Sequence, residues 1–216
     1  MPDHYYTQTP ASAHKPGQVD FLWRGEKLVF ETDSGVFSRT EIDKGTEILL
    51  NALPEELSGS LLDLGCGYGV IGVTLGRRYP GLSVTMSDVN ERAVELSRRN
   101  AQRSGVQAQV MQSDGYASIP FRRYDWILQN PPIRAGKSVI YAMFAEGARR
   151  LEPNGALWLV IRKQQGAESA AAYLKTLFGQ VEAVTKKGGY WVLRCARPAE
   201  TVWPDQTTQN KGEAGK

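Results

Sequence analysis

The stretch that most constrains the fold is residues 61–72, Leu-Leu-Asp-Leu-Gly-Cys-Gly-Tyr-Gly-Val-Ile-Gly. An apolar run ends in glycines at alternate positions, and an amphipathic pattern then begins, which predicts a strand, a tight loop and a helix. Glycines permit sharp turns and close approach of a ligand, and the helix that follows directs its N-terminal amides at that ligand. The stretch therefore predicts a ligand site at the end of a strand.

Beyond this stretch, apolar strand runs alternate with helical patterns along most of the chain. Strands are predicted at 61–64, 82–86, 108–111, 126–128 and 157–161, and helices at 70–78, 91–104, 138–151 and 168–178. Glycine turns predict hairpins that join 19–23 to 27–31 and 181–185 to 190–195. The sequence thus predicts an α/β fold with a doubly wound, mostly parallel, Rossmann-like seven-stranded sheet, an antiparallel C-terminal hairpin and an N-terminal β-hairpin extension.

The 216 residues, 41% of them hydrophobic, are enough for one well-buried domain. We expect residues 1–55 to form an arm, a hairpin and a lid helix packed on the core, and residues 56–197 to form the core. The polar residues 198–216 are expected to be a disordered tail. The net charge of +3 is small, and most basic doublets are typical of solvated helix ends and turns.

Several classes of protein are disfavoured by composition. No apolar run approaches the roughly 20 residues that span a bilayer, and the N-terminus does not resemble a signal peptide, so we expect a cytoplasmic protein without a membrane partner. Cys66 and Cys195 lie far apart and show no metal-ligand spacing, which predicts neither a metal site nor a disulfide framework.

The glycines alone leave two cofactors open. Residues 67–72 also fit the dinucleotide spacing G-x-G-x-x-G, so nicotinamide cofactors and S-adenosylmethionine (SAM) are both compatible with the loop. Asp63, two positions before Gly65 at a strand end, favours SAM, because it suits the methionine amino group.

Polar residues follow each of the next predicted strands, where ligands of such a sheet bind. Asp88, with Val89 beside it, is suited to accept the ribose hydroxyls of a nucleoside cofactor, although an acid there also suits a helix N-cap. Asp114, after Ser113, is suited to the adenine amino group, although an acid before glycine is ordinary in a turn.

Asn130-Pro131-Pro132 follows the fourth strand and predicts the reaction. The prolines remove two amide donors and stiffen the backbone, so the Asn130 side chain and nearby carbonyl oxygens are expected to face the site as acceptors. Acceptors held in this way can bind a planar amino group and direct its lone pair at a methyl donor. Phe37 is expected either to pack inward or to act as a lid over the cofactor or substrate.

These motifs together resemble the class I SAM-dependent methyltransferases. More narrowly, the chain is similar to the small-domain methyltransferases related to the catalytic half of the 16S ribosomal RNA guanine-N2 methyltransferase C. The resemblance is carried by Asp-Leu-Gly-Cys-Gly-Tyr-Gly at 63–69, Gly-Val-Phe-Ser at 35–38, Asp43-x-Gly45, Asn-Pro-Pro-Ile-Arg-Ala-Gly-Lys at 130–137, Lys-Gln-Gln-Gly at 163–166 and Gly-Tyr-Trp-Val-Leu at 189–193.

The resemblance implies methyl transfer from SAM to an exocyclic amine, most directly guanine N2 of 16S ribosomal RNA, as part of rRNA processing. It implies that Asp63, Gly65, Gly67 and Tyr68 hold the methionine part of SAM, Asp88 the ribose and Asp114 the adenine, while Asn130 holds the target amine. Two features depart from the family pattern. Ile133 stands where an aromatic residue is frequent, which leaves base stacking to Phe37, and the printed sequence has no counterpart of the duplicated N-terminal domain of the larger rRNA enzymes.

Ribosomal RNA or the small ribosomal subunit is the expected partner. Arg134, Lys137, Arg162 and Lys163 follow strand ends at the expected active face, where they are suited to hold phosphates. Methylation of a protein glutamine amide is a second hypothesis, since release-factor methyltransferases use a similar Asn-Pro-Pro motif. A catalytically silent SAM- or RNA-binding module is a third, and the oligomeric state is left open.

Overall fold

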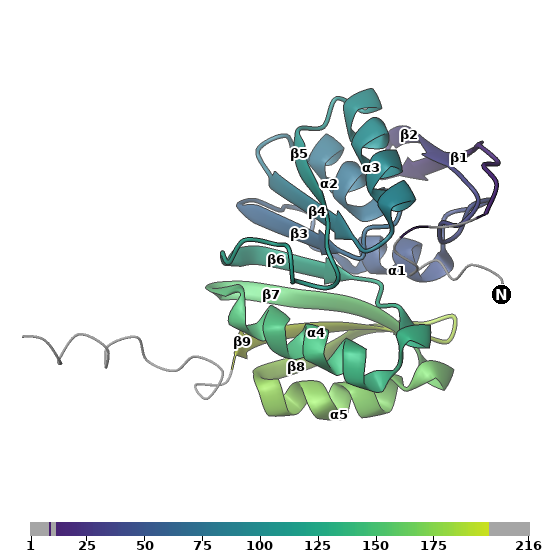
Figure 1. Cartoon of the computed structure of the whole chain (residues 1–216). Helices are drawn as coiled ribbons and strands as arrows, with labels where there is room; N and C mark the ends of the chain where they lie inside the picture. Colours follow the sequence, from purple (N-terminus) through teal and green to yellow (C-terminus); the bar gives the residue numbers. More distant parts are fainter. Residues whose placement is uncertain (1–8, 10–11, 199–216) are drawn as a thin grey trace, which may run out of the picture.

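The structure, a computed structural model, describes residue 9 and residues 12–198 (Figure 1). Most of the expected N-terminal arm and all but Pro198 of the expected tail lie outside the described residues. Among the described residues, no helix combines the length and apolar character needed to cross a bilayer.

The main sheet has seven strands in the order β5-β4-β3-β6-β7-β9-β8. Within this sheet the strands from β3 to β7 run parallel, and β9 runs antiparallel to both β7 and β8. A separate hairpin pairs β1 (Gly17–Trp23) with β2 (Glu26–Thr32). The strands of the main sheet are β3 (Ser60–Leu64), β4 (Ser83–Asp88), β5 (Ala108–Gln112), β6 (Tyr124–Gln129), β7 (Leu151–Arg162), β8 (Phe178–Lys187) and β9 (Tyr190–Pro198). This confirms the predicted fold class.

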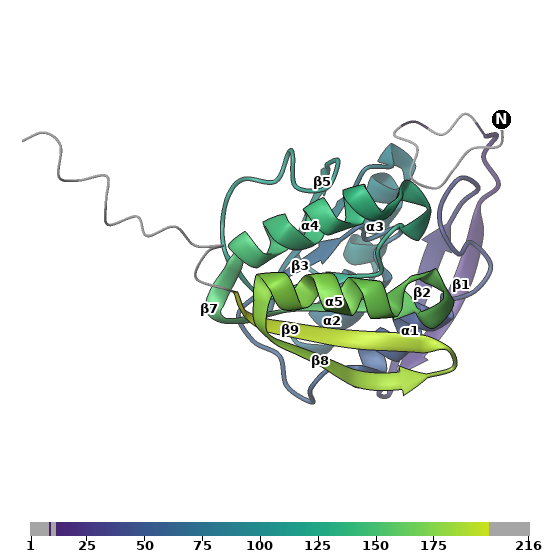
Figure 2. The same ribbon diagram turned by 90° about the horizontal axis from the view of Figure 1, so that it is seen from below.

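Helices cover both faces of the sheet (Figure 1). One face packs against the first three helices, with the hairpin packed on the second and third of them. The other face packs against the last two helices, which lie beside each other in Figure 2. The helices are α1 (Lys44–Ala52), α2 (Val70–Arg78), α3 (Glu91–Arg103), α4 (Lys137–Arg149) and α5 (Ala167–Leu177), with short 3-10 turns η1 (Ile133–Ala135) and η2 (Lys163–Gln165). Strands β4 and β5 follow on one side of β3, and the next strand, β6, pairs with β3 on its other side. The strand order therefore reverses between β3 and β6, and ligands of such sheets bind at this switch point.

The N-terminal hairpin is bound to the main domain through Asn100 of α3. The fully buried Asn100 side chain accepts from the Glu31 amide at 2.8 Å and donates to the Glu31 carbonyl at 3.0 Å, as a neighbouring strand would. It also donates to the carbonyl of Tyr68 in the glycine loop at 2.8 Å. One buried side chain therefore connects the hairpin to the predicted ligand loop.

The largest boundary error concerns β7, which begins at Leu151 rather than at residue 157. Pro153-Asn154-Gly155 reads as a turn, and the pairing with β6 is irregular there, with a register shift between Tyr124 and Trp126. Gly155 fits because a Cβ would lie 2.6 Å from the Tyr124 carbonyl oxygen. The strand is longer than predicted because the backbones of β6 and β7 approach closely at Gly155, and the periodicity of the sequence gives no sign of this contact.

Candidate active site

A cavity of about 490 Å³ opens over the carboxyl ends of β3, β4, β5 and β6. This volume lies within the range of small-molecule and cofactor sites. Of the residues predicted to bind cofactor or to act in catalysis, all but Asp63 line it: Gly65, Gly67, Tyr68, Asp88, Val89, Ser113, Asp114, Asn130, Pro131 and Pro132.

The glycine loop after β3 is folded onto the end of β4. The amides of Gly65 and Cys66 both donate to the Ser87 carbonyl, at 2.8 and 2.9 Å, and the Gly67 amide donates to Asp88 Oδ2 at 2.8 Å. Gly65 and Gly67 have φ angles of +73° and +57°, and a Cβ at either position would meet nothing within 4 Å. The loop therefore forms an open cradle that side chains would fill.

Asp63 lies behind this loop rather than on the cavity wall. Its carboxylate is 1% exposed, and Oδ2 accepts from the Gly72 amide of α2 at 2.9 Å. Oδ1 is buried without a hydrogen-bond partner. Burial, reinforced by the nearby charge of Asp88, raises the pKa of Asp63 to about 7. An orphaned carboxylate oxygen beneath the cradle fits a cofactor that brings a cationic amino group.

Asp88 ends β4 at the cavity and does not cap α3. Its Oδ1 accepts from the Asn90 amide at 2.9 Å, whereas the helix cap is Asn90, whose side chain accepts from Ala93. Burial raises the pKa of Asp88 to about 6, although backbone amides donate to its carboxylate. Each oxygen retains a further lone pair, so the carboxylate can still accept the hydroxyls of a ribose.

The far end of the cavity carries Val89, Ser113, Asp114 and Gly115. The Ser113 hydroxyl donates to the Gly115 carbonyl at 2.9 Å and accepts from the Ser118 amide at 3.0 Å, so it serves the turn. Asp114 is exposed at the rim. This end thus presents one apolar side chain and one free-standing carboxylate, which suits an adenine.

Phe37 forms part of the cavity wall and is 37% exposed, so it is not packed into the core, and its role as a lid stays a prediction. Its loop is bound to the main domain at several points. The Tyr68 hydroxyl donates to the Ser38 carbonyl at 3.0 Å, and the Asn90 side chain donates to the Gly35 carbonyl at 2.8 Å. Asn90 thereby contacts both the predicted cofactor acid Asp88 and the loop that carries Phe37.

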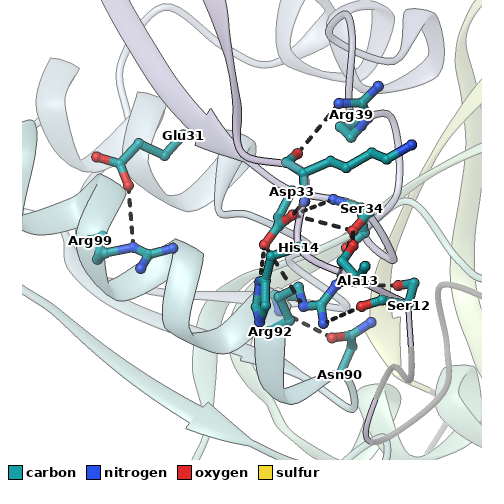
Figure 3. A network of polar contacts seen from close by, with 12 residues as sticks. Ser12, Ala13, His14, Glu31, Asp33, Ser34, Arg39, Asn90, Arg92 and Arg99 are labelled. Carbon is teal, nitrogen blue, oxygen red and sulfur yellow. Dashed lines mark hydrogen bonds and ion pairs between the residues drawn. The ribbon is translucent and has the colours of Figure 1, made fainter.

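Arg92 of α3 fastens the start of the same loop (Figure 3). The guanidinium group is 9% exposed and donates to the Ser34 carbonyl at 2.7 Å and to the Ser12 carbonyl at 3.0 Å. Asp33 accepts from the Lys15 and Ser34 amides at 2.6 and 2.7 Å, and His14 contacts the same carboxylate. Residues 12–15 therefore lie against the loop and α3, and sequence patterns gave no sign of this network.

Asn130 is hydrogen-bonded to the start of α1. Its amide nitrogen donates to Asp43 Oδ2 at 2.9 Å and to Thr46 Oγ1 at 3.0 Å. Asp43 and Thr46 also line the cavity, although neither was among the predicted site residues. Asp43 entered the sequence prediction only through the Asp43-x-Gly45 motif of the family resemblance, which gave it no role in the site.

The turn after the prolines differs from expectation at Ile133. The Pro132 carbonyl accepts from the Ala135 amide at 2.8 Å, which closes the η1 turn and uses one of its two lone pairs. Ile133 packs against the apolar cluster shared with α4 and α5, because the turn directs Pro132 and Ala135 to the cavity instead. Its position does not support the expected contact of Ile133 with a target base.

The predicted phosphate-binding residues lie outside the cavity. Arg134 and Lys137 are exposed beside it, just before Val139, which lines it. Lys163 borders a separate hollow with Lys186, Tyr190 and Trp191, and its ammonium group lies 3.9 Å from Glu168 Oε1.

Two negative observations bear on the chemistry. Within the described part of the chain, no group of three or more histidine, cysteine or acidic residues could hold a metal ion. Both cysteines are free and buried, and burial raises the pKa of each thiol, so neither is a ready nucleophile.

Four features together define the class of SAM-dependent methyltransferases. They are a doubly wound sheet, a glycine loop over a buried acid with an unpartnered oxygen, acids at the ends of successive strands, and an Asn-Pro-Pro turn on the same cavity. Residues 27–194 match the Methyltransferase small domain family. The chain belongs to this family, and SAM is its cofactor.

Similar proteins fall into two groups by length. The chain is 42% identical over 200 residues to a protein of Bacillus subtilis (strain 168) named "Uncharacterized protein YbxB", covering 91% of this chain and 100% of that one. It is 41% identical over 170 residues to "Ribosomal RNA small subunit methyltransferase C" of Hahella chejuensis (strain KCTC 2396), covering 73% of this chain and 49% of that one. The chain thus spans about half the length of that rRNA enzyme.

A solved structure of an rRNA methyltransferase is also matched over about half of its length. The T. thermophilus 16S rRNA N2 G1207 methyltransferase (RsmC), in complex with AdoMet and guanosine, superposes with a TM-score of 0.77 at 27% identity. The match covers 87% of this chain and 52% of that chain. The chain is therefore a SAM-dependent methyltransferase related to RsmC.

Proposed function

We propose that this enzyme methylates an exocyclic amine of a nucleobase, and that its substrate is guanine N2 in 16S ribosomal RNA. The observation that carries the proposal is that Asn130, Pro131, Pro132 and Phe37 line the same cavity as the glycine loop and Asp88. A cofactor held over the glycine loop and a planar base held by Asn130 and Phe37 would meet inside one cavity. Guanine as the base is supported by the guanosine complex of the T. thermophilus relative.

When bound, SAM supplies an electrophilic methyl group. Asp63 and the glycine loop would hold its methionine part, Asp88 its ribose, and Val89, Ser113 and Asp114 its adenine. Every one of these except Asp63 lines the cavity, and Asp63 offers its unpartnered Oδ1 from beneath the loop.

Asn130 has the main chemical task. A nucleobase amine is a weak nucleophile because its lone pair is delocalised into the ring. Asn130 Oδ1 accepts an N–H of this amine and turns the lone pair toward the methyl group, while Phe37 supports the flat ring. The amine loses a proton easily after transfer, so positioning rather than a strong base supplies most of the rate.

The exposed cations Arg134, Lys137 and Lys163 are proposed to hold RNA phosphates outside the cavity. Phosphate contacts position a nucleic acid without reading its sequence, so they are compatible with a target base chosen by the cavity. A guanine within a duplex would have to be turned out of the stack to enter.

The test is the fate of labelled methyl. Purified enzyme is incubated with methyl-labelled SAM and either 16S rRNA or small subunits, and the digested nucleosides are separated by mass spectrometry. We expect label in N2-methylguanosine. The control is Asn130→Ala, which should bind SAM normally, while the activation free energy of methyl transfer should rise by roughly 2–4 kcal/mol. Label found only in protein would replace this proposal with glutamine methylation, and no transfer at all would indicate a silent binding module.

A further inference from the structure

We propose that Asp43 is a positioning residue, which fixes the side-chain amide of Asn130 so that its oxygen, and not its nitrogen, faces the methyl acceptor. The inference rests on the proposed function, because it assumes that Asn130 accepts a hydrogen bond from the target amine. It gives a role to a second residue from the segment before β3, which already contributes Phe37 to a cavity built mainly from the ends of the sheet strands.

The hydrogen bonds around Asn130 define which way its amide points. Both Asp43 Oδ2, at 2.9 Å, and Thr46 Oγ1, at 3.0 Å, lie on the side of the Asn130 nitrogen. A carboxylate has no hydrogen to donate, so a reversed amide would place its oxygen against the charge of Asp43. The two hydrogens of the nitrogen are then used, and Oδ1 is the part of the amide that remains for a ligand.

Asp43 is itself held firmly. It is the N-cap of α1, and the same Oδ2 accepts from the Thr46 amide at 3.0 Å. Gly45 packs so closely that a Cβ would lie 2.9 Å from both Asp43 Oδ2 and the Tyr190 ring of β9. The start of α1 therefore packs tightly against the sheet, and this packing holds the Asp43 carboxylate beside Asn130.

Two simpler roles would place the same carboxylate here. Asp43 could serve only as a helix cap, or its charge could accept the proton that the methylated amine releases. Substitutions separate the three roles. Asparagine retains an oxygen that can cap α1 and accept from Asn130, but it has no charge. Serine is an equally good N-cap, yet its shorter side chain does not reach Asn130.

The experiment measures kcat, the KM for RNA and the SAM Kd for Asp43→Asn and Asp43→Ser. Asp43→Asn should lower kcat by no more than about threefold, and Asp43→Ser by about tenfold or more, where tenfold corresponds to about 1.4 kcal/mol. The SAM Kd and the thermal midpoint should be the same in both variants. In an Asn130→Ala background, the two Asp43 variants should transfer methyl at equal rates, measured in single turnovers.

Each other result overturns the proposal. Wild-type activity in both the serine and the asparagine variant would reduce Asp43 to a helix cap. An equal loss of activity in both variants, with a weakened pH dependence, would make it a proton acceptor. A difference that persists in the Asn130→Ala background would show that Asp43 does not act through Asn130.

A second measurement needs no substrate, so it separates this inference from the proposed function. The side-chain amide signals of Asn130 are assigned in ¹⁵N-labelled protein by their loss in Asn130→Ala. They should move in Asp43→Ser far more than in Asp43→Asn, because only serine removes the acceptor. Unmoved signals in Asp43→Ser would refute the contact, whatever the enzyme methylates. A wild type that makes no N2-methylguanosine, with signals that move as expected, would refute only the proposed function.

Discussion

Replacing Asp63 by asparagine should stabilise the cofactor-free protein at alkaline pH and weaken its binding of SAM. The Asp63 carboxylate is 1% exposed, with one oxygen on the Gly72 amide and the other without a partner. Burial is the main cause that raises its pKa to about 7. The wild type thus folds around a carboxylate whose charge has little solvation, and asparagine removes that charge without changing the shape.

The size of the effect follows from the pKa. The shift from 3.8 to about 7 is roughly three units, and at about 1.4 kcal/mol per unit the ionised group costs up to about 4 kcal/mol. Because the folded state holds the proton more tightly, the stability due to this group is full below about pH 4 and is lost as the pH rises to about 7. The stability of Asp63→Asn relative to wild type should therefore rise by about 2–4 kcal/mol between pH 4 and pH 8.

Urea unfolding at several pH values, with and without SAM, tests both halves of this prediction. Comparing two pH values cancels any constant cost of the new amide group. SAM should stabilise the wild type and protect the variant much less, since the amide cannot pair with a cationic amino group. A variant whose relative stability does not change with pH would show that Asp63 does not ionise in this range. Normal SAM binding by the variant would limit Asp63 to supporting the loop.

Two further predictions concern the cofactor and the substrate. Asp88→Ala should weaken SAM binding by ~1–3 kcal/mol in calorimetry, through lost hydrogen bonds to the ribose; unchanged affinity would remove Asp88 from the cofactor site. RNA binding should weaken steeply with salt, and the Lys137→Ala, Lys163→Ala double variant should flatten the slope by about one unit per lysine while binding SAM normally. Activity that does not respond to salt would argue against RNA.

The fold could be predicted because its signals are local. The runs that become β3 and β4 are buried along almost their whole length, and the helices between strands carry one apolar face. The cofactor was predictable for a related reason. In a parallel sheet the strands end at one edge, so acids that follow different strands, such as Asp88 and Asp114, gather at the same cavity.

The contacts that sequence reasoning missed join distant parts of the chain. Asn130 and Asp43 are separated by 87 residues, and Arg92 and Ser34 by 58. No periodicity links such pairs, because they meet only once α1 and the hairpin have packed on the sheet. The direction of Ile133 also depends on packing, since a single 3-10 turn decides whether residue 133 or residue 135 faces the cavity.

The two sides of the cavity come from different parts of the chain. The cofactor half of the cavity comes from the ends of the sheet strands, whereas Phe37, Ser38, Asp43 and Thr46 come from the segment before β3. Asn90, Tyr68 and Asn130 all form hydrogen bonds to that segment. If the target amine binds against this segment, as proposed, the methyl donor site of the sheet can stay the same while the acceptor changes. This is consistent with a sequence that predicts SAM more directly than it predicts the base.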